Sequence, residues 1–259
     1  MAWLIIIVSV FVMWISTLCK ILHTARSSSK AAFLSNGGSF HQRNVLLVIA
    51  HPDDESMFFT PTINYLTSRG HSVHIICMST GNANGMGNIR KEELYQASAV
   101  LKIPVQQVKI LDHPDFQDGF GKVWNCELLA SIIDEEIRSH AIDLIITFDN
   151  YGVSGHCNHR EVNLGMRSKL LHETAERDIE AWELISNNIL RKYSGPVDIC
   201  LSLVYVTMYQ NGELHCLLNE RPNRSYNAMA QHRSQWIWFR KLFVVFSSYT
   251  YVNTLKKIN

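Results

Sequence analysis

The sequence lacks an excess of either charge, paired cysteine spacing and internal repeats. Its 24 Lys and Arg residues are balanced by 23 Asp and Glu residues, so the basic stripe of a nucleic-acid-binding protein is missing and we expect no nucleic-acid partner. The six cysteines are scattered without C-x-x-C spacing, which fits reduced thiols in the cytosol better than a disulfide framework. What is present is 259 residues, 47% of them hydrophobic, enough for one large α/β domain.

The first segment is an uncharged apolar run. Residues 3–19 contain no Asp, Glu, Lys or Arg and are roughly long enough to cross a bilayer. A cleaved signal peptide is the alternative, but a basic leading region and a small-x-small cleavage site are missing. We therefore predict a single transmembrane anchor over residues 3–22, a Ser- and Gly-rich linker over 23–43 and a folded domain over 44–259. The basic residues after the anchor predict that this domain faces the cytoplasm.

Strands and helices alternate through the domain. Apolar runs predict strands at 44–49, 73–78, 108–111 and 142–148, and amphipathic patterns predict helices at 56–66, 89–101 and 128–137. This order predicts an α/β fold with a doubly wound, mostly parallel, Rossmann-like sheet of order 3-2-1-4-5. Two later runs, 199–208 and 213–218, are predicted to be strands joined at 210–212, which would add antiparallel strands to the sheet.

Polar side chains follow two of the predicted strands. The first strand is followed by His51, Asp53 and Asp54, and the fourth by His156 and His159. In a sheet of this order the first and fourth strands are neighbours, so the loops after them should meet. Imidazole and carboxylate ligands with a spare carboxylate between them are what a hydrolytic metal site requires. The sequence therefore predicts a metal-dependent hydrolase.

Each motif alone has a simpler interpretation. Most H-x-x-H pairs are ordinary surface residues. The turn at 50–55 could be a solvated helix start, where Asp54 caps the helix and acidic side chains suit its dipole. The prediction of a metal site depends on the two motifs occurring together at strand ends that the topology makes adjacent.

The same residues carry a resemblance to a known family. The motif Ala50-His51-Pro52-Asp53-Asp54-Glu55, with Gly155-His156-Cys157-Asn158-His159 downstream, resembles the LmbE-like zinc deacetylase superfamily. Within it, the chain is similar to the eukaryotic branch that deacetylates N-acetylglucosaminyl-phosphatidylinositol, from about Asn44 to near the C-terminus, including His232-Arg233-Ser234-Gln235. The resemblance implies a zinc-dependent N-deacetylase acting on a glycolipid in the second step of GPI-anchor biosynthesis. It also implies that the protein is located at the endoplasmic reticulum membrane.

The resemblance also implies roles for the residues of both motifs. Zinc would be held by His51, Asp54 and His159. Asp53 would be the general base, and a protonated His156 would stabilise the oxyanion or donate a proton. Bacterial relatives usually read H-P-D-H where this chain has Cys157 and Asn158, so a carboxylate that could orient a histidine is absent there. A filler role is favoured for Cys157.

Further substrate contacts are predicted at Arg90, Asp115 and His232. The alternatives are a solvated helix face for Arg90, a turn-forming role for Asp115 and a structural hydrogen bond for His232. The aromatic and basic stretch 236–246 is predicted to lie on a membrane surface, with an ordinary core-packing helix as the alternative.

Two other functions remain open from the sequence. One is deacetylation of another N-acetylglucosaminyl conjugate, and the other is a non-catalytic, membrane-anchored scaffold. Five polar groups converging on one crevice argue against the scaffold. No feature of the sequence predicts an oligomeric state.

Overall fold

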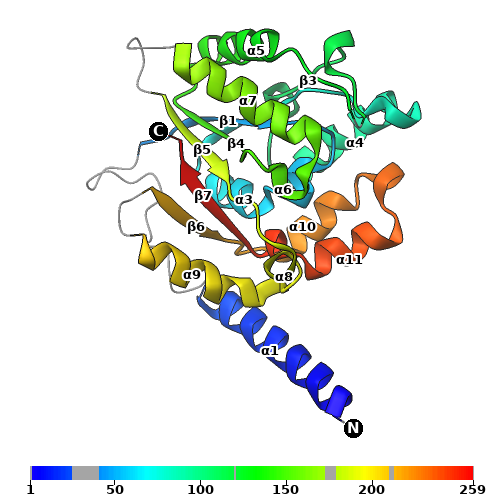
Figure 1. Cartoon of the computed structure of the whole chain (residues 1–259), viewed down its shortest axis with the longest axis vertical. Coiled ribbons are helices and arrows are strands. Elements are labelled where there is room, and N and C mark those ends of the chain that lie inside the picture. The colour runs from blue at the N-terminus through cyan, green and yellow to red at the C-terminus, as the bar shows by residue number, and fades with distance from the viewer. Residues whose placement is uncertain (1, 25–40, 120, 173–178, 210–212, 259) are drawn as a thin grey trace.

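A seven-stranded sheet forms the centre of the molecule, in the order β3-β2-β1-β4-β5-β7-β6 (Figure 1). The computed structural model describes residues 2–24, 41–119, 121–172, 179–209 and 213–258. The strands are β1 (Asn44–Ile49), β2 (Ser72–Cys77), β3 (Val108–Ile110), β4 (Leu144–Phe148), β5 (Glu180–Leu184), β6 (Leu214–Leu218) and β7 (Val252–Lys257). Strands β1 to β5 are parallel, and β7 pairs antiparallel with both β5 and β6. The predicted order 3-2-1-4-5 with added antiparallel strands is confirmed.

Helices cover both faces of this sheet (Figure 1). The α-helices are α1 (Ala2–Thr24), α2 (Asp54–Met57), α3 (Thr60–Ser68), α4 (Gly87–Val100), α5 (Cys126–Ser139), α6 (Gly152–Gly155), α7 (Cys157–His172), α8 (Ile189–Lys192), α9 (Asp198–Met208), α10 (Pro222–Met229) and α11 (Trp238–Phe246). The 3₁₀ turns are η1 (Asn82–Asn84), η2 (Val105–Gln107), η3 (Pro114–Phe116), η4 (Gly195–Val197), η5 (Arg233–Gln235) and η6 (Ser248–Thr250).

Strand β1 divides the core into two layers because successive side chains point to opposite faces. Val45 and Leu47 pack in the layer that holds α3 and α4, whereas Leu46 and Val48 pack in the layer of α5 and α7. All four side chains are buried, and each contributes about 1.5–3 kcal/mol through removal of its apolar surface from water. Burial on both faces explains why β1 is an uninterrupted apolar run, and it fixes the position of the loop that follows.

Residues 199–208 form helix α9, so the strand predicted there is wrong. The buried residues Asp198, Ile199 and Ser202 follow helical spacing, and the Asp198 carboxylate accepts a hydrogen bond from Arg191 Nε at 2.7 Å. A short apolar run does not distinguish a strand from a helix by periodicity. Strand β6 pairs instead with β7, and the predicted turn at 210–212 lies outside the described residues.

The residues of the predicted anchor form helix α1. Most of its apolar side chains between Trp3 and Ile15 are exposed, and Trp14 packs on the domain, with ring centroids 6.2 Å from Phe246 and 6.1 Å from Tyr251. Within the described residues, no helix combines the length and the apolar character that crossing a bilayer requires. The transmembrane anchor predicted over residues 3–22 is therefore not supported. Of the predicted linker, residues 25–40 lie outside the described part of the chain.

Candidate metal centre

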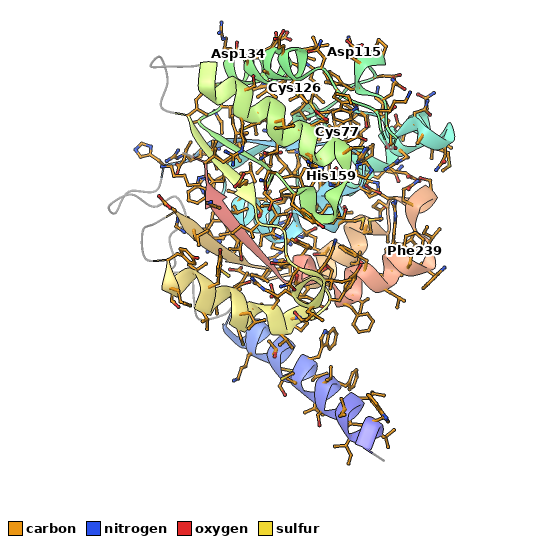
Figure 2. All side chains as sticks on the ribbon, in the orientation of Figure 1. Cys77, Asp115, Cys126, Asp134, His159 and Phe239 are labelled. Carbon is orange, nitrogen blue, oxygen red and sulfur yellow. The ribbon has the colours of Figure 1, made fainter. Side chains whose placement is uncertain are left out.

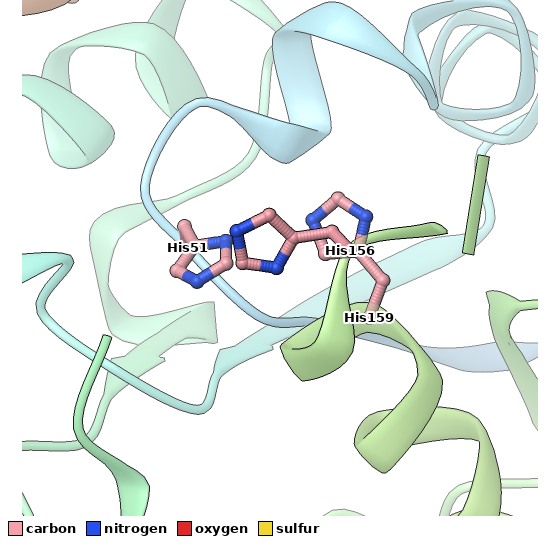
Figure 3. Close-up of side chains that lie close together, drawn as sticks. All are labelled: His51, His156 and His159. Carbon is pink, nitrogen blue, oxygen red and sulfur yellow. The ribbon is translucent and has the colours of Figure 1, made fainter. Parts of the chain in front are cut away.

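Two loops that are distant in sequence meet at the carboxyl edge of the sheet. Strands β1 and β4 pair in parallel, with Val45 opposite Leu144, so the chain segments that follow them are neighbours. Figure 3 shows the imidazole of His51 from the first loop beside those of His156 and His159 from the second. One ring nitrogen from each of the three lies within 4.8 Å of the others. The predicted meeting of the two motifs is confirmed.

Asp54 completes this cluster from the side of the first loop. Its Oδ2 accepts hydrogen bonds from the backbone N–H groups of Ala50 at 3.0 Å and His51 at 2.8 Å. Its Oδ1 lies 3.1 Å from His159 Nε2. Two donors that are each about 2.0–2.1 Å from a tetrahedral zinc ion are about 3.3–3.4 Å apart, so this pair is spaced for a shared ion. Imidazole nitrogens with a carboxylate oxygen are also the donor types that zinc accepts.

His159 is held in a single orientation. Its ring stacks on Phe148, with centroids 4.1 Å apart and planes 3° from parallel. Its Nδ1 lies 3.0 Å from the carbonyl oxygen of Gly152, and a proton donated there leaves the Nε2 lone pair directed at Asp54. Gly152 has a φ of +67°, and a Cβ at this position would lie 2.7 Å from His159 Cβ. The glycine therefore serves both the turn and the close approach of the histidine.

Asp118 is a member of the site that the sequence motifs did not indicate. Its Oδ1 lies 3.1 Å from His51 Nε2, and the Oδ1 of Asn158 lies at the same distance. Asp118 lies between η3 and α5, well beyond the end of β3. It supplies the carboxylate that the second motif lacks at Asn158, but from a different loop. Its place in a cluster of acidic residues after the third predicted strand was the one available signal.

In this cluster, neighbouring charges shift the pKa values of His51 and Asp54 in the direction opposite to burial. Burial alone would lower the pKa of His51, but a hydrogen bond to Asp118 and the negative charge of Asp54 raise it above its usual value. Burial would raise the pKa of Asp54, but the neighbouring His159 holds it well below its usual range. A carboxylate that stays ionised between two imidazoles is suited to binding a cation.

His156 differs electrostatically from the other two histidines. Burial, together with the positive charges of His51 and His159, lowers the pKa of His156 to about 4. The imidazole is therefore neutral near pH 7, which does not favour the predicted protonated form. A neutral ring still offers one N–H donor, and the backbone N–H of Asn158 lies 3.3 Å from its Nδ1.

Asp53 is held in a strained turn beside the cluster. Its φ is 125°, a conformation that costs a residue with a side chain about 1–3 kcal/mol. Its backbone N–H donates to Glu55 Oε2 at 3.1 Å, and its carboxylate forms ion pairs with Arg90, at 3.4 Å, and with Arg240 of α11. The carboxylate is thus buried next to the metal-binding donors, with both of its charge partners on other elements.

Arg90 and His232 are both buried. Arg90 donates to the carbonyl oxygens of Gly81 at 2.8 Å and Pro52 at 2.7 Å, so the solvated helix face considered for it is wrong. His232 is fully buried, and its Nε2 lies 2.6 Å from Glu55 Oε1, which is the structural hydrogen bond considered as the alternative to a substrate contact.

Asp115 lies away from the metal-binding cluster. Its side chain is about half exposed, and its charge partner is His113, at 3.9 Å. It borders a surface pocket with Lys122 and Trp124 and is well separated from His159 (Figure 2). A contact between Asp115 and the substrate stays a prediction.

Solved structures share this fold. The N,N'-diacetylchitobiose deacetylase of Pyrococcus horikoshii superposes with a TM-score of 0.58, covering 94% of this chain and 92% of that protein at 14% identity. A deacetylase of teicoplanin biosynthesis superposes with a TM-score of 0.55, covering 83% of this chain and 97% of that protein at 13% identity. Identities this low establish the fold alone.

Sequence relatives are much closer. Residues 46–169 match the family described as PIG-L, GlcNAc-PI de-N-acetylase. The N-acetylglucosaminyl-phosphatidylinositol de-N-acetylase of Bos taurus is 38% identical over 224 residues, covering 86% of this chain and 85% of the bovine protein. A probable enzyme of the same name from Schizosaccharomyces pombe is 36% identical, covering 93% and 95%. The chain therefore belongs to the GlcNAc-PI de-N-acetylase (PIG-L) family.

Proposed function

We propose that this protein is a metal-dependent N-deacetylase acting on N-acetylglucosaminyl-phosphatidylinositol. It hydrolyses the acetamide to give glucosaminyl-phosphatidylinositol and acetate, the second step of GPI-anchor biosynthesis. The observation that carries the proposal is the convergence of His51 and Asp54 with His156 and His159, from loops a hundred residues apart, in a chain of this family. The bovine relative, 38% identical, has this activity in its name.

We assign His51, Asp54 and His159 as the metal ligands, with the three imidazoles as the alternative set. The 3.1 Å between His159 Nε2 and Asp54 Oδ1 supports the first set, as does the ionised state of Asp54. A divalent ion held there, zinc in this proposal, supplies a Lewis acid that polarises the acetamide carbonyl and acidifies water.

Asp53 and His156 carry the proton transfer and the charge stabilisation in this proposal. Asp53 accepts a proton as water adds to the acetamide carbon, and it returns that proton to the amine nitrogen as the C–N bond breaks. His156, neutral near pH 7, donates its N–H to the carbonyl oxygen as negative charge develops there. The ion pairs of Asp53 with Arg90 and Arg240 keep its carboxylate in place before the substrate arrives.

We place the reaction at the membrane of the endoplasmic reticulum, on its cytoplasmic face. The substrate is a lipid, and exposed apolar side chains gather on α8, α9 and α11, which lie at the same end of the molecule as α1 (Figure 1). They include Ile189, Leu190, Leu201, Leu203, Val204, Met208, Trp238, Phe239, Leu242 and Phe246. Trp and Phe side chains on such a surface suit the boundary between headgroups and acyl chains.

Acetate release tests this function against the two alternatives. The full chain is assayed on N-acetylglucosaminyl-phosphatidylinositol in vesicles and on water-soluble N-acetylglucosaminyl sugars, with a chelator and then with zinc restored. We expect turnover of the glycolipid that the chelator abolishes and zinc restores. Turnover of the soluble sugars alone indicates another conjugate as substrate, and no acetate release from any compound indicates a scaffold.

Asp53→Asn separates catalysis from metal binding. We expect the variant to bind zinc normally and to lose about 10²–10⁴-fold in turnover, the usual contribution of a general acid–base group. Asp134→Asn is the matched control, because Asp134 pairs with Arg138 on α5, far from His159 (Figure 2). Wild-type turnover in Asp53→Asn would remove Asp53 from the mechanism.

A further inference from the structure

Helix α11 presents an apolar face outward and a charged side chain inward. Phe243 and Val244 are buried, whereas Trp238 and Phe239 are 72% and 50% exposed. Arg240, on the same helix, extends the other way and forms an ion pair with the buried carboxylate of Asp53. One helix thus connects the apolar surface of the molecule to the candidate active site.

Arg240 has hydrogen-bond donors left unused by the described residues, whereas most donors of Arg90 are already bonded within the protein. Arg90 spends both terminal nitrogens on backbone carbonyl groups, at Gly81 and Pro52. Arg240 contacts Asp53 through Nη1, and among the described residues its Nε and Nη2 have no hydrogen-bond partner. Its side chain is 22% exposed, so Arg240 is accessible from solvent although it contacts a buried carboxylate. The edge formed by Nε and Nη2 is the one that binds a phosphate with two parallel hydrogen bonds.

The order of groups in the protein matches the order of groups in the proposed substrate. Moving outward, the protein presents the metal-binding cluster, then Arg240, then the apolar face formed by Trp238, Phe239 and Leu242. The glycolipid presents the acetamide-bearing sugar, then inositol, then an anionic phosphodiester, then acyl chains. With the acetamide at the metal centre and the acyl chains at the apolar face, the phosphodiester falls in the region of Arg240.

We propose that Arg240 binds the phosphodiester of the substrate through Nε and Nη2 while Nη1 remains on Asp53. The residue then selects for an anionic phosphate ester linked to the sugar and sets its distance from the reacting acetamide. This inference rests on the proposed function. The competing role for Arg240 is to hold Asp53 alone, in which case the phosphate of the substrate is irrelevant.

Two water-soluble substrates distinguish these roles. One is N-acetylglucosaminyl-inositol phosphate, and the other is N-acetylglucosaminyl-inositol without phosphate. For Arg240→Gln in the full chain we expect KM for the phosphate compound to rise about 10–100-fold, the usual range for a lost hydrogen bond to a charged group. KM for the phosphate-free compound should match wild type, and measurable turnover of that compound shows that the variant folds. Any fall in kcat should be equal on the two compounds, because Asp53 loses the same charge partner in both cases. Arg240→Lys should recover part of the loss because it restores charge without the paired geometry.

Lys241→Gln is the matched control. It removes the same charge from the next position of α11, where the side chain lies over the Trp236 ring instead of facing Asp53. We expect wild-type kinetics from it on both compounds. An equal rise in KM on both compounds, or no rise on either, overturns the phosphate role, while turnover by the wild-type protein still supports the deacetylase function. Failure of the wild-type protein to release acetate from either compound overturns the function and this inference together.

Discussion

Replacing Gly152 by alanine tests how the structure positions His159. At a φ of +67°, an alanine costs about 1–2 kcal/mol more than glycine. The new Cβ would also meet His159 Cβ at 2.7 Å, and His159 has little room to move because its ring stacks on Phe148. Overpacking of this kind adds about 1–3 kcal/mol, so we expect a total loss of about 2–5 kcal/mol in the free energy of unfolding. Displacement of the imidazole should weaken zinc binding about 10–100-fold.

Gly70→Ala is the control that isolates the backbone cost. Gly70 has a φ of +76°, and a Cβ there would have no atom within 4 Å. We expect it to lose about 1–2 kcal/mol and to bind zinc like wild type. Urea unfolding followed by circular dichroism gives the free energies, and competition with a chromogenic chelator gives the zinc affinities. Equal destabilisation and equal zinc affinity in the two variants would refute the claim that Gly152 positions His159.

Three further predictions concern neighbouring residues. Asp118→Asn should weaken zinc binding about 10–100-fold in the chelator competition, because His51 loses its carboxylate partner; unchanged affinity contradicts this role. Burial would lower the pKa of His232, but the charge of Glu55 raises it above its usual value. The pair therefore stabilises the fold fully below the unfolded-state pKa of about 6.5, and this stabilisation is lost as pH rises through the folded-state pKa. The difference in unfolding free energy between wild type and His232→Gln should therefore shrink from pH 6 to pH 9, and a growing difference contradicts the assignment. Cys157→Ser should keep zinc affinity within about twofold, because Cys157 lies outside the histidine cluster and its thiol bonds the Gly119 carbonyl oxygen.

The strand order could be predicted because short apolar runs alternate with longer amphipathic segments through the first half of the domain. A run such as 45–49, apolar at every position, rich in β-branched residues and followed by a polar turn, is typical of a strand buried on both faces of a sheet. The site followed from that order, since neighbouring parallel strands bring their loops together. The family resemblance added the roles of His51, Asp54 and His159, which spacing alone did not assign.

The features that escaped prediction depend on contacts between distant segments. Helix α9 was predicted as a strand because its apolar run does not reveal that Asp198 pairs with Arg191 and that Ser202 is buried one turn later. Strand β7 was missed because it is inserted between β5 and β6, and both of these partners are distant from it in sequence. Asp118 and Arg240 belong to no motif. Their partners lie 67 and 187 positions away, so a local pattern does not identify the contacts that they make.

The buried bond between Glu55 and His232 has a consequence for how the protein is made. Glu55 supports the backbone of Asp53 with one carboxylate oxygen and holds His232 with the other, so a segment near the end of the chain finishes a turn near its beginning. During synthesis, the ribosome releases this partner long after the first motif has emerged. A nascent chain that ends before α10 and α11 should have its early strands in place and yet lack enzymatic activity, because the residues that complete the turn at Asp53 are translated last.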